Sequence, residues 1–406
     1  MKQTKKAIMY GAGNIGRGFI GALLSKSGYQ VTFIDVAKPV VEALRQRGSY
    51  PVRILSDEGF TDEIIENVDA IDGNDAAAVA EAIANADIMA TAVGANILKF
   101  IVPNIAAGLK LRFAQTEAPL NIIICENLMD ANKVVEGMLK ERLTEDEQQL
   151  FDERVGLVEA SIGRMVPVQT PEMQDGDLLR VCVERYGYLP VDRDAFRGEI
   201  PQITSMVPFS PFDFYIRRKL YIHNLGHATT AYLGLYTQKE YIYESIDNAD
   251  TYAIVLNAML ESAEALAKKY SVSLPDVMRH IQDLLFRFTN RALKDTCARV
   301  GADIKRKLAP QDRLIGSASL CMEQGITPAF LCVGAAGAVY EYLKQNNLEQ
   351  TRENAIETLN QLSGLTEGTL VDQILEYYAL FAAGEPVANI RRAAQKNKAK
   401  HNTDVV

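Results

Sequence analysis

The chain lacks the features that mark several classes of protein. Its 406 residues include only 14 prolines, and its longest apolar runs fall far short of the roughly 18 residues that span a bilayer. Positive charge is not in excess, because 43 Lys and Arg residues face 52 Asp and Glu residues, for a net charge of −9. This composition excludes collagen, coiled coil and bulk disorder, and it predicts neither nucleic acid nor an anionic membrane as a partner. The basic N-terminus has no signal-peptide core, so we expect a cytoplasmic protein.

Residues that form disulfides or bind metals are also scarce. The five cysteines are widely spaced and include no C-x-x-C pair, which argues against a disulfide framework and against a cysteine-based zinc site. Two of the four histidines, His223 and His227, stand four residues apart, which is one ingredient of a zinc site. No acidic third ligand is nearby in the sequence, so we expect no metal.

Short apolar runs alternate with helix-length segments in the first half of the chain. Strands that are apolar on both faces and separated by helices indicate an α/β fold with a doubly wound, mainly parallel sheet of the Rossmann type. After about residue 205 almost every segment has the pattern of a helix, which predicts an all-helical C-terminal domain. We therefore expect an α/β domain over 1–205, a helical domain over 206–390 and a basic polar tail over 391–406. The predicted strands are 6–10, 30–34, 88–93, 121–125, 155–160 and 179–184, and the later predicted helices include 251–270, 275–294 and 329–344.

A glycine-rich loop follows the first predicted strand and opens the first predicted helix. The segment from Gly11 to Gly16 fits G-x-G-x-x-G, in which the glycines permit a tight turn, close approach of a pyrophosphate and packing of helix on strand. Asp35 ends the second strand, where a carboxylate accepts a hydrogen bond from the adenosine ribose and repels a 2′-phosphate. We therefore predict NAD rather than NADP; a glycine turn without a cofactor is the alternative. The predicted cofactor-binding residues are Gly11, Ala12, Gly13, Asn14, Ile15, Gly16, Asp35, Thr91, Val93 and Gly94.

The segment 217–227 carries three polar side chains that suit alcohol chemistry. At about 100° per residue, Lys219, His227 and Asn224 fall at about 0°, 80° and 140° on one side of a helix. An amine, an imidazole and an amide on one side suit proton abstraction from an alcohol beside a donor that holds the oxyanion. On spacing alone, a solvated helix face with a core-facing histidine is the simpler interpretation.

Motifs along nearly the whole chain resemble one family. They are Y-G-A-G-N-I-G-R-G-F-I-G at 10–21, C-E-N-L at 125–128, R-K-L…N-L-G-H-A at 218–228 and L-K-D…R-V-G…D-R-L-I at 293–315. In this order they resemble the mannitol-1-phosphate 5-dehydrogenases of the polyol-specific long-chain (mannitol) dehydrogenase family, for which K-x4-N-x2-H is specific. The resemblance implies metal-independent, NAD-linked oxidation of a secondary alcohol, with mannitol 1-phosphate and fructose 6-phosphate as the substrate pair. The implied partner is a small sugar alcohol or sugar phosphate, and the implied assembly a monomer or small homo-oligomer.

The resemblance also implies a role for individual side chains. Lys219 would be the general base, Asn127 and Asn224 would hold the alkoxide and then the carbonyl oxygen, and His227 would bind and orient the substrate. A lysine with its ordinary pKa of about 10.4 works as a base only where burial or a positive charge, such as that of NAD⁺, lowers the pKa. Asn127 follows the strand 121–125 at its carboxyl end, where open α/β sheets bind ligands. Further substrate-binding candidates are Arg164, His223 and Arg306.

Two positions depart from the family's pattern. Gly163 stands where the family has an acidic residue, and Ala302 stands where it has an arginine. If that arginine shapes a phosphate pocket, the phosphorylated substrate is the expectation that these changes weaken. An unphosphorylated polyol such as mannitol, or a hexuronate such as fructuronate or tagaturonate, therefore stays open as the substrate.

Two other classes of protein share parts of this pattern. A β-hydroxyacid dehydrogenase also combines a Rossmann domain with helices, but its K-x3-N spacing is not the spacing found here. A sensor that binds NAD without catalysis has no need of a proton acceptor, so the set formed by Lys219, Asn224 and His227 argues against it.

Overall fold

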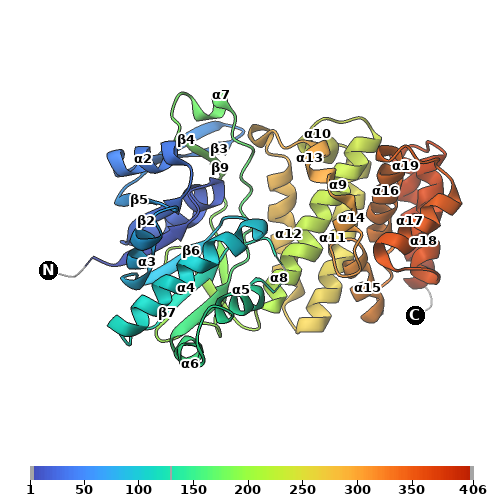
Figure 1. Ribbon diagram of the computed structural model, residues 1–406. Coiled ribbons are helices and arrows are strands. Elements are labelled where there is room, and N and C mark those ends of the chain that lie inside the picture. Colours follow the sequence, from blue (N-terminus) through green and yellow to red (C-terminus); the bar gives the residue numbers. More distant parts are fainter. Residues whose placement is uncertain (1–3, 129, 403–406) are drawn as a thin grey trace. The chain divides into compact units, whose positions relative to one another are not determined.

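The computed structural model describes residues 4–128 and 130–402, and of residues 401 and 402 it describes the backbone alone. The chain divides into two compact units that meet in the sequence between Asp213 and Phe214. Figure 1 shows a sheet with helices in the first unit and a set of helices in the second. The predicted fold class is therefore confirmed.

The main sheet of the first unit is parallel throughout and has six strands in the order β5-β2-β1-β6-β7-β8. From β1 the chain adds β2 and then β5 on one side of the sheet. It then returns to β6, on the other side of β1, and continues outward with β7 and β8. Ligands of doubly wound sheets bind at the carboxyl ends of the strands beside such a reversal. The glycine loop directly follows β1, and Thr91 is the last residue of β6, so both lie at this edge of the sheet. The strands are β1 (Lys6–Tyr10), β2 (Gln30–Asp35), β5 (Val68–Asp72), β6 (Ile88–Thr91), β7 (Leu120–Ile124) and β8 (Val155–Glu159).

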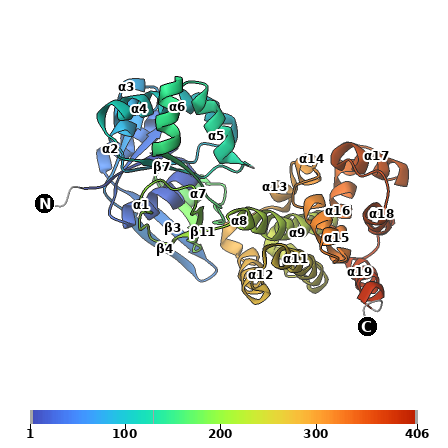
Figure 2. The same ribbon diagram turned by 90° about the horizontal axis from the view of Figure 1, so that it is seen from below.

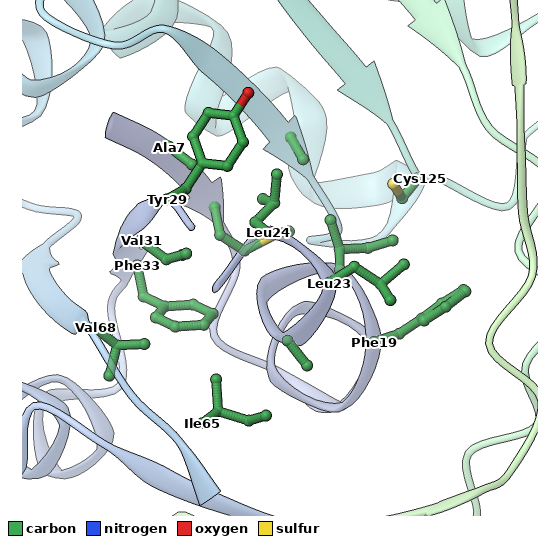
Figure 3. Close-up of a cluster of buried hydrophobic side chains, with 14 of the residues drawn as sticks. Ala7, Phe19, Leu23, Leu24, Tyr29, Val31, Phe33, Ile65, Val68 and Cys125 are labelled. Carbon is green, nitrogen blue, oxygen red and sulfur yellow. The ribbon is translucent and has the colours of Figure 1, made fainter. Parts of the chain in front are cut away.

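Both faces of this sheet are covered (Figure 2). One face packs against α3 (Ala76–Ala84), α4 (Leu98–Gln115), α5 (Ala131–Lys140) and α6 (Glu145–Arg154). The other packs against η1 (Gly16–Gly21), α1 (Ala22–Lys26) and α2 (Lys38–Arg47). Figure 3 shows part of this second core, to which the first helix contributes Phe19, Leu23 and Leu24, and β2 contributes Val31 and Phe33. The helix that opens at the glycine loop is thus anchored by apolar side chains, which fixes the loop before it.

Smaller strands complete the first unit and explain where it ends. A three-stranded sheet has the order β4-β3-β9, and β10 (Leu189–Asp192) pairs in parallel with β11 (Met206–Phe209). Because β11 belongs to the first unit, that compact unit extends to Asp213, and a domain division after residue 205 stays a prediction. The remaining elements are β3 (Tyr50–Ser56), β4 (Gly59–Ile65), η2 (Ala95–Ile97), α7 (Pro171–Gln174) and β9 (Val181–Glu184).

The second unit is built around α16 (Ala329–Gln345), in which residues 329–339 are all buried. Helices α9, α11, α18 and α19 pack around it. A helix that is apolar on every side requires such neighbours, because no face of it can be left in water. The other helices are α8 (Asp213–Arg218), η3 (Lys219–Asn224), α9 (Leu225–Tyr236), α10 (Ile242–Ile246), α11 (Ala249–Tyr270), α12 (Leu274–Phe288), η4 (Arg291–Leu293), α13 (Cys297–Gly301), α14 (Ile304–Lys307), α15 (Ile315–Glu323), α17 (Arg352–Ser363), α18 (Thr369–Ala382) and α19 (Val387–Asn402).

The C-terminal segment is not a polar tail over most of its length. Residues 391–402 belong to α19, in which Ile390 and Ala394 are fully buried and Asn397 is nearly so. The expected tail over 391–406 is therefore corrected for residues 391–402, while residues 403–406 lie outside the described range. The apolar positions of α19 are few, but their spacing of about four residues puts them on one buried stripe.

The helix predicted over 275–294 is also shorter than expected. Helix α12 ends at Phe288, and Lys294 adopts a left-handed conformation with φ of 47°. The amide of Ile242 donates to the carbonyl oxygen of Asp295 at 2.9 Å, and the amide of Cys297 donates to that of Glu240 at 2.8 Å. The 3₁₀ turn η4 takes the place of the last expected helical turn, and these bonds fix a short extended segment after it, which carries Asp295.

All five cysteines are free and buried, as expected for a chain without a disulfide framework. Within the described part of the chain, no helix has the length and apolar character that crossing a membrane requires.

Candidate active site

In the loop between β1 and the first helix, each glycine lies in a different steric environment. Gly11 has φ of +103°, and a Cβ there would lie 2.5 Å from the carbonyl oxygen of Ala92. A Cβ on Gly16 would overlap the carbonyl oxygen of Gly11, so the third glycine lets the helix pack on the turn. A Cβ on Gly13 would meet no atom within 4 Å. The exposed side of the loop at Gly13 is thus the place where a ligand can approach the backbone.

Asp35 and Arg17 hold the loop in this shape. The amide of Ala12 donates to Oδ2 of Asp35 at 2.6 Å, and the amide of Ala37 donates to Oδ1 of the same carboxylate at 2.9 Å. The buried Arg17 donates through Nε to the carbonyl oxygen of Ala12 at 2.6 Å, and burial lowers the pKa of its guanidinium. Each carboxylate oxygen of Asp35 has a second lone pair, so these bonds leave acceptor capacity for a ribose hydroxyl.

The loop therefore fits a dinucleotide. Asn14 and Ile15 open the helix directly after the open side of Gly13, and the first amides of a helix bind phosphate. At the end of β6 the hydroxyl of Thr91 is buried and makes no hydrogen bond within the described part of the chain. An orphaned hydroxyl at this edge is compatible with a ligand that supplies the missing partner. NAD binding by these residues stays a prediction.

Glu126, which sequence reasoning did not single out, shapes the second loop of this edge. Its carboxylate is buried and accepts the amides of Val93 at 3.0 Å and Gly94 at 2.8 Å. Gly94 has φ of +92°, so the chain turns sharply at this point. Asn127 follows Glu126 and is exposed. The buried carboxylate of Glu126 thus fixes the backbone at Val93 and Gly94 and lies next to Asn127, and these are three of the predicted site residues. In the sequence, only its position in the C-E-N-L motif pointed to Glu126.

In the second unit, Lys219 and Asn224 begin and end a π turn. Helix α8, the π turn η3 and helix α9 form one continuous helical stretch. Hydrogen bonds in a π turn join residues five apart, so Lys219 and Asn224 lie closer together around the helix axis than they would in an α-helix. The separation of about 140° expected for an α-helix is therefore corrected. Single π turns inside α-helices occur frequently at functional sites.

The three polar side chains of this stretch form its accessible strip. Between Tyr221 and Ala228, every residue except Asn224 and His227 is buried, and Lys219 one turn earlier is half-buried. We call Lys219, Asn224 and His227 the polar strip.

Aromatic and acidic groups surround His227. Its ring stacks on Phe288, with centroids 5.0 Å apart and planes 13° apart, and its Nε2 lies 3.1 Å from Oδ2 of Asp295. His223 lies behind it, with ring centroids 6.0 Å apart. Burial, followed by the charges of Arg287, His227, His280 and Lys219, lowers the pKa of His223 well below 6.5, so His223 is neutral at pH 7.

Two family models match the chain in succession. The model described as the mannitol dehydrogenase Rossmann domain matches residues 5–205, and the mannitol dehydrogenase C-terminal domain matches residues 212–396. The chain belongs to the mannitol dehydrogenase family. The resemblance seen in its motifs is thereby confirmed.

Relatives within the mannitol dehydrogenase family are similar over nearly their whole length. A mannitol-1-phosphate 5-dehydrogenase of Brevibacillus brevis is 36% identical over 92% of this chain and 97% of its own length. Proteins of the same name from Thermoanaerobacter pseudethanolicus and Bacillus pumilus are 35% and 37% identical, over 92% and 89% of this chain and 97% and 96% of their own lengths.

Two solved structures share the fold. The Pseudomonas fluorescens mannitol 2-dehydrogenase, in a ternary complex with NAD and D-mannitol, has a TM-score of 0.74 at 15% identity, over 97% of this chain and 95% of the other. A D-sorbitol dehydrogenase in substrate-free form has a TM-score of 0.78 at 14% identity, over 94% and 96%. At such low identity these similarities concern the mannitol dehydrogenase fold alone.

The three substrate-binding candidates lie in settings different from the polar strip. Arg164 donates to the carbonyl oxygens of Glu184 at 3.0 Å and Gly18 at 2.8 Å, contacts that brace the first unit. His223 is buried behind His227 instead of lying on the strip. Arg306 is partly exposed and pairs with Asp303 at 2.6 Å. Substrate contact by Arg164, His223 and Arg306 stays a prediction.

Among the described residues, no cluster of three or more His, Cys, Asp or Glu side chains is arranged to bind a metal ion. His223 and His227 share their surroundings with Phe288, and the one carboxylate beside them, Asp295, is engaged by Arg299 as well. That metal plays no part in the reaction stays a prediction.

Proposed function

We propose that this protein is an NAD-dependent polyol dehydrogenase that interconverts mannitol 1-phosphate and fructose 6-phosphate. The observation that carries the proposal is the polar strip, in which the half-buried amine of Lys219 adjoins the amide of Asn224 and the imidazole of His227, the two partly exposed residues of the otherwise buried segment from Tyr221 to Ala228. Relatives that carry the name mannitol-1-phosphate 5-dehydrogenase cover most of the chain at 35–37% identity, which supports this substrate pair.

The first unit supplies the binding of the cofactor. The amides after Gly13 hold the pyrophosphate at the start of the helix, and Asp35 accepts a hydrogen bond from the adenosine ribose. The carboxylate of Asp35 repels a 2′-phosphate, so NAD is preferred over NADP. When bound, NAD⁺ accepts the hydride that leaves the carbinol carbon of the substrate.

The second unit supplies the movement of the proton. The neutral amine of Lys219 takes the hydroxyl proton of the substrate as the carbon–hydrogen bond breaks, and it returns the proton when the ketone is reduced. The amide groups of Asn224 and Asn127 donate hydrogen bonds to the oxygen as it gains charge and becomes a carbonyl. His227 binds a neighbouring hydroxyl and so orients the carbon that reacts. A lysine base with amide donors requires no metal ion, so dialysis against a strong chelator should leave the rate unchanged. A loss of activity that zinc restores would contradict this mechanism.

An unphosphorylated polyol is the second candidate substrate. It is favoured by Ala302, which is exposed and has no charge to offer a phosphate, and by the pairing of Arg306 with Asp303. The gain or loss of NADH absorbance with a panel of substrates separates the candidates. The panel consists of mannitol 1-phosphate, mannitol, fructose 6-phosphate, fructose, fructuronate and tagaturonate.

The panel has three informative outcomes. Turnover of mannitol 1-phosphate and fructose 6-phosphate at least about a hundredfold above that of mannitol and fructose is the expected result. Preference for an unphosphorylated polyol or a hexuronate would contradict the substrate but leave the dehydrogenase chemistry in place. Binding of NAD without turnover of any member would favour the non-catalytic sensor.

A further inference from the structure

Asp295 contacts the imidazole of the polar strip. Its Oδ2 lies 3.1 Å from Nε2 of His227, a buried nitrogen that has no aligned hydrogen-bond partner in the described structure, and the side chains of Asp295 and His227 are only 12% and 14% exposed. Phe288 stacks on one face of the imidazole, with the ring planes 13° apart. The ring is therefore held by a flat apolar surface against its face and a carboxylate at one edge.

Asp295 is itself held firmly in place. Its other oxygen, Oδ1, accepts Nε of Arg299 at 2.7 Å and lies 2.5 Å from Nη2 of the same guanidinium. Its carbonyl oxygen accepts the amide of Ile242 at 2.9 Å, and the adjoining Thr296 caps the helix of Arg299 by accepting its amide at 3.2 Å. Because hydrogen bonds hold both the backbone and the side chain of Asp295, its carboxylate has a fixed position beside His227.

We propose that Asp295 is a positioning residue of this site: its carboxylate holds the proton of His227 on Nε2, so that Nδ1 presents a lone pair to a substrate hydroxyl. The two ring nitrogens of a neutral imidazole differ, and the hydrogen bond at one nitrogen decides what the other can do. A carboxylate accepts only, so the nitrogen beside it carries the hydrogen. The inference rests on the proposed function only in making a substrate hydroxyl the partner of Nδ1.

The partners of Asp295 support this arrangement. Burial acts to raise the pKa of its carboxyl group, but the contacts of the carboxylate with His227 and Arg299 outweigh burial, and the pKa is lowered from its ordinary value. Asp295 is thus ionised at neutral pH and acts as an acceptor toward His227. A protonated carboxyl group could donate to the ring and hold the opposite tautomer.

The tautomer of His227 is directly observable, because the chain has only four histidines. In protein labelled with ¹⁵N-histidine, the two ring nitrogens of a neutral imidazole differ clearly in chemical shift according to which one carries the hydrogen. Comparison with His227→Gln assigns the signals. We expect the Nε2–H form for His227 in the parent protein and a mixture of tautomers in Asp295→Asn. An Nδ1–H form in the parent, or an unchanged spectrum in Asp295→Asn, would overturn the proposal whatever the substrate is.

Activity gives the second readout. Asp295→Asn should lower kcat/KM for the alcohol on the order of tenfold to a hundredfold, the range known for carboxylates behind metal-bound imidazoles. The affinity for NAD⁺, measured by quenching of NADH fluorescence in competition, should be unchanged, because the glycine loop belongs to the first unit. Asp295→Glu should restore part of kcat/KM if its longer side chain still reaches Nε2.

A matched control tests whether loss of any partly buried Asp–Arg pair has the same effect. Asp250 pairs with Arg391 at 2.6 Å and contacts no histidine in the described structure, so Asp250→Asn removes the same charge elsewhere in the second unit. We expect its kcat/KM to stay within about twofold of the parent's. Equal losses in the two variants, accompanied by equal falls in Tm, would reduce Asp295 to a structural residue. Failure of the substrate panel together with a changed His227 tautomer would instead reject the proposed function and keep the positioning role.

Discussion

The glycine loop and the polar strip each adjoin a π turn, but they present their functional groups in different ways. The loop before η1 offers backbone amides, and its side chains matter chiefly by being absent at Gly11, Gly13 and Gly16. The strip across η3 offers an amine, an amide and an imidazole, and its backbone matters by reducing the angle between Lys219 and Asn224 around the helix axis. A site that binds its ligand through backbone amides requires glycines, because a side chain would block the approach. A site that binds through side chains depends on the geometry of its helix and on the residues that pack against each functional group.

The largest effect on stability should come from a substitution that fills the space between Gly16 and the backbone of Gly11. Gly16→Ala places a methyl group against the carbonyl oxygen of Gly11, a backbone atom that cannot move aside cheaply. We expect a loss of about 3 kcal/mol in the free energy of unfolding of the first unit, at the upper end of the usual cost of overpacking. Urea titration followed by circular dichroism measures this loss.

Gly13→Ala is the matched control, because a Cβ at Gly13 meets nothing within 4 Å. Its stability should remain near that of the parent, while its affinity for NAD⁺ falls about tenfold or more, since the methyl group occupies the approach of the pyrophosphate. Equal stability of the two variants would show that the three glycines do not have the separate roles assigned to them.

The next effect concerns the choice of cofactor. Asp35→Ser removes a charge that repels a 2′-phosphate and a hydrogen bond to the ribose. Charged hydrogen bonds contribute roughly 1.5–3 kcal/mol, so the preference for NAD over NADP should fall on the order of tenfold to a hundredfold. The ratio of kcat/KM for the two cofactors measures it. If that ratio does not change, Asp35 serves only the amides of Ala12 and Ala37.

The smallest effect lies away from both sites. Glu261 is fully buried and accepts the amides of Phe330 and Leu331 at the start of α16, with Lys398 at 3.3 Å. Burial raises its pKa to about 7, against the opposing effect of Lys398 and the two amides. The folded protein therefore binds this proton more tightly than the unfolded chain does, and stability falls as the pH rises from about 4.5 through about 7.

Unfolding in urea at pH 5.5 and pH 8 checks this pH dependence. The parent should lose about 2 kcal/mol of stability between the two conditions, and Glu261→Gln should lose distinctly less. Glu264→Gln, on the same helix but partly exposed, is the control and should behave as the parent does. A Glu261→Gln variant with the parent's pH dependence would show that another group takes up the proton.

The difference between the two regions also explains what the sequence could reveal. The glycine loop, Asp35 and the buried strands follow from residue type and spacing, because turns, helix starts and two-sided burial each require particular residues. Strands β3, β4, β5, β10 and β11 were not predicted, and of these β4 is exposed along most of its length and has no apolar pattern. In the second unit the motif singled out Lys219, Asn224 and His227, but the π turn leaves no mark in the periodicity.

The groups that support the site were the hardest to find. Asp295 lies 68 residues after His227 in the sequence, so no local pattern connects the two side chains. Glu126 binds the amides of Val93 and Gly94 from a different strand end. Such contacts join distant parts of the chain, so only the folded structure shows them.

The central claim is that Lys219 is the base, and the rates of two variants at saturating NAD⁺ test it most directly. Lys219→Ala should bind NAD⁺ as the parent does, yet oxidise the alcohol about 10²–10⁴-fold more slowly, the usual contribution of a positioned base. The parent's rate should rise with pH through one ionisation, which Lys219→Ala should lose and His227→Ala should keep. If His227→Ala loses that ionisation while Lys219→Ala keeps both it and most of the rate, then His227 is the proton acceptor and the account is wrong.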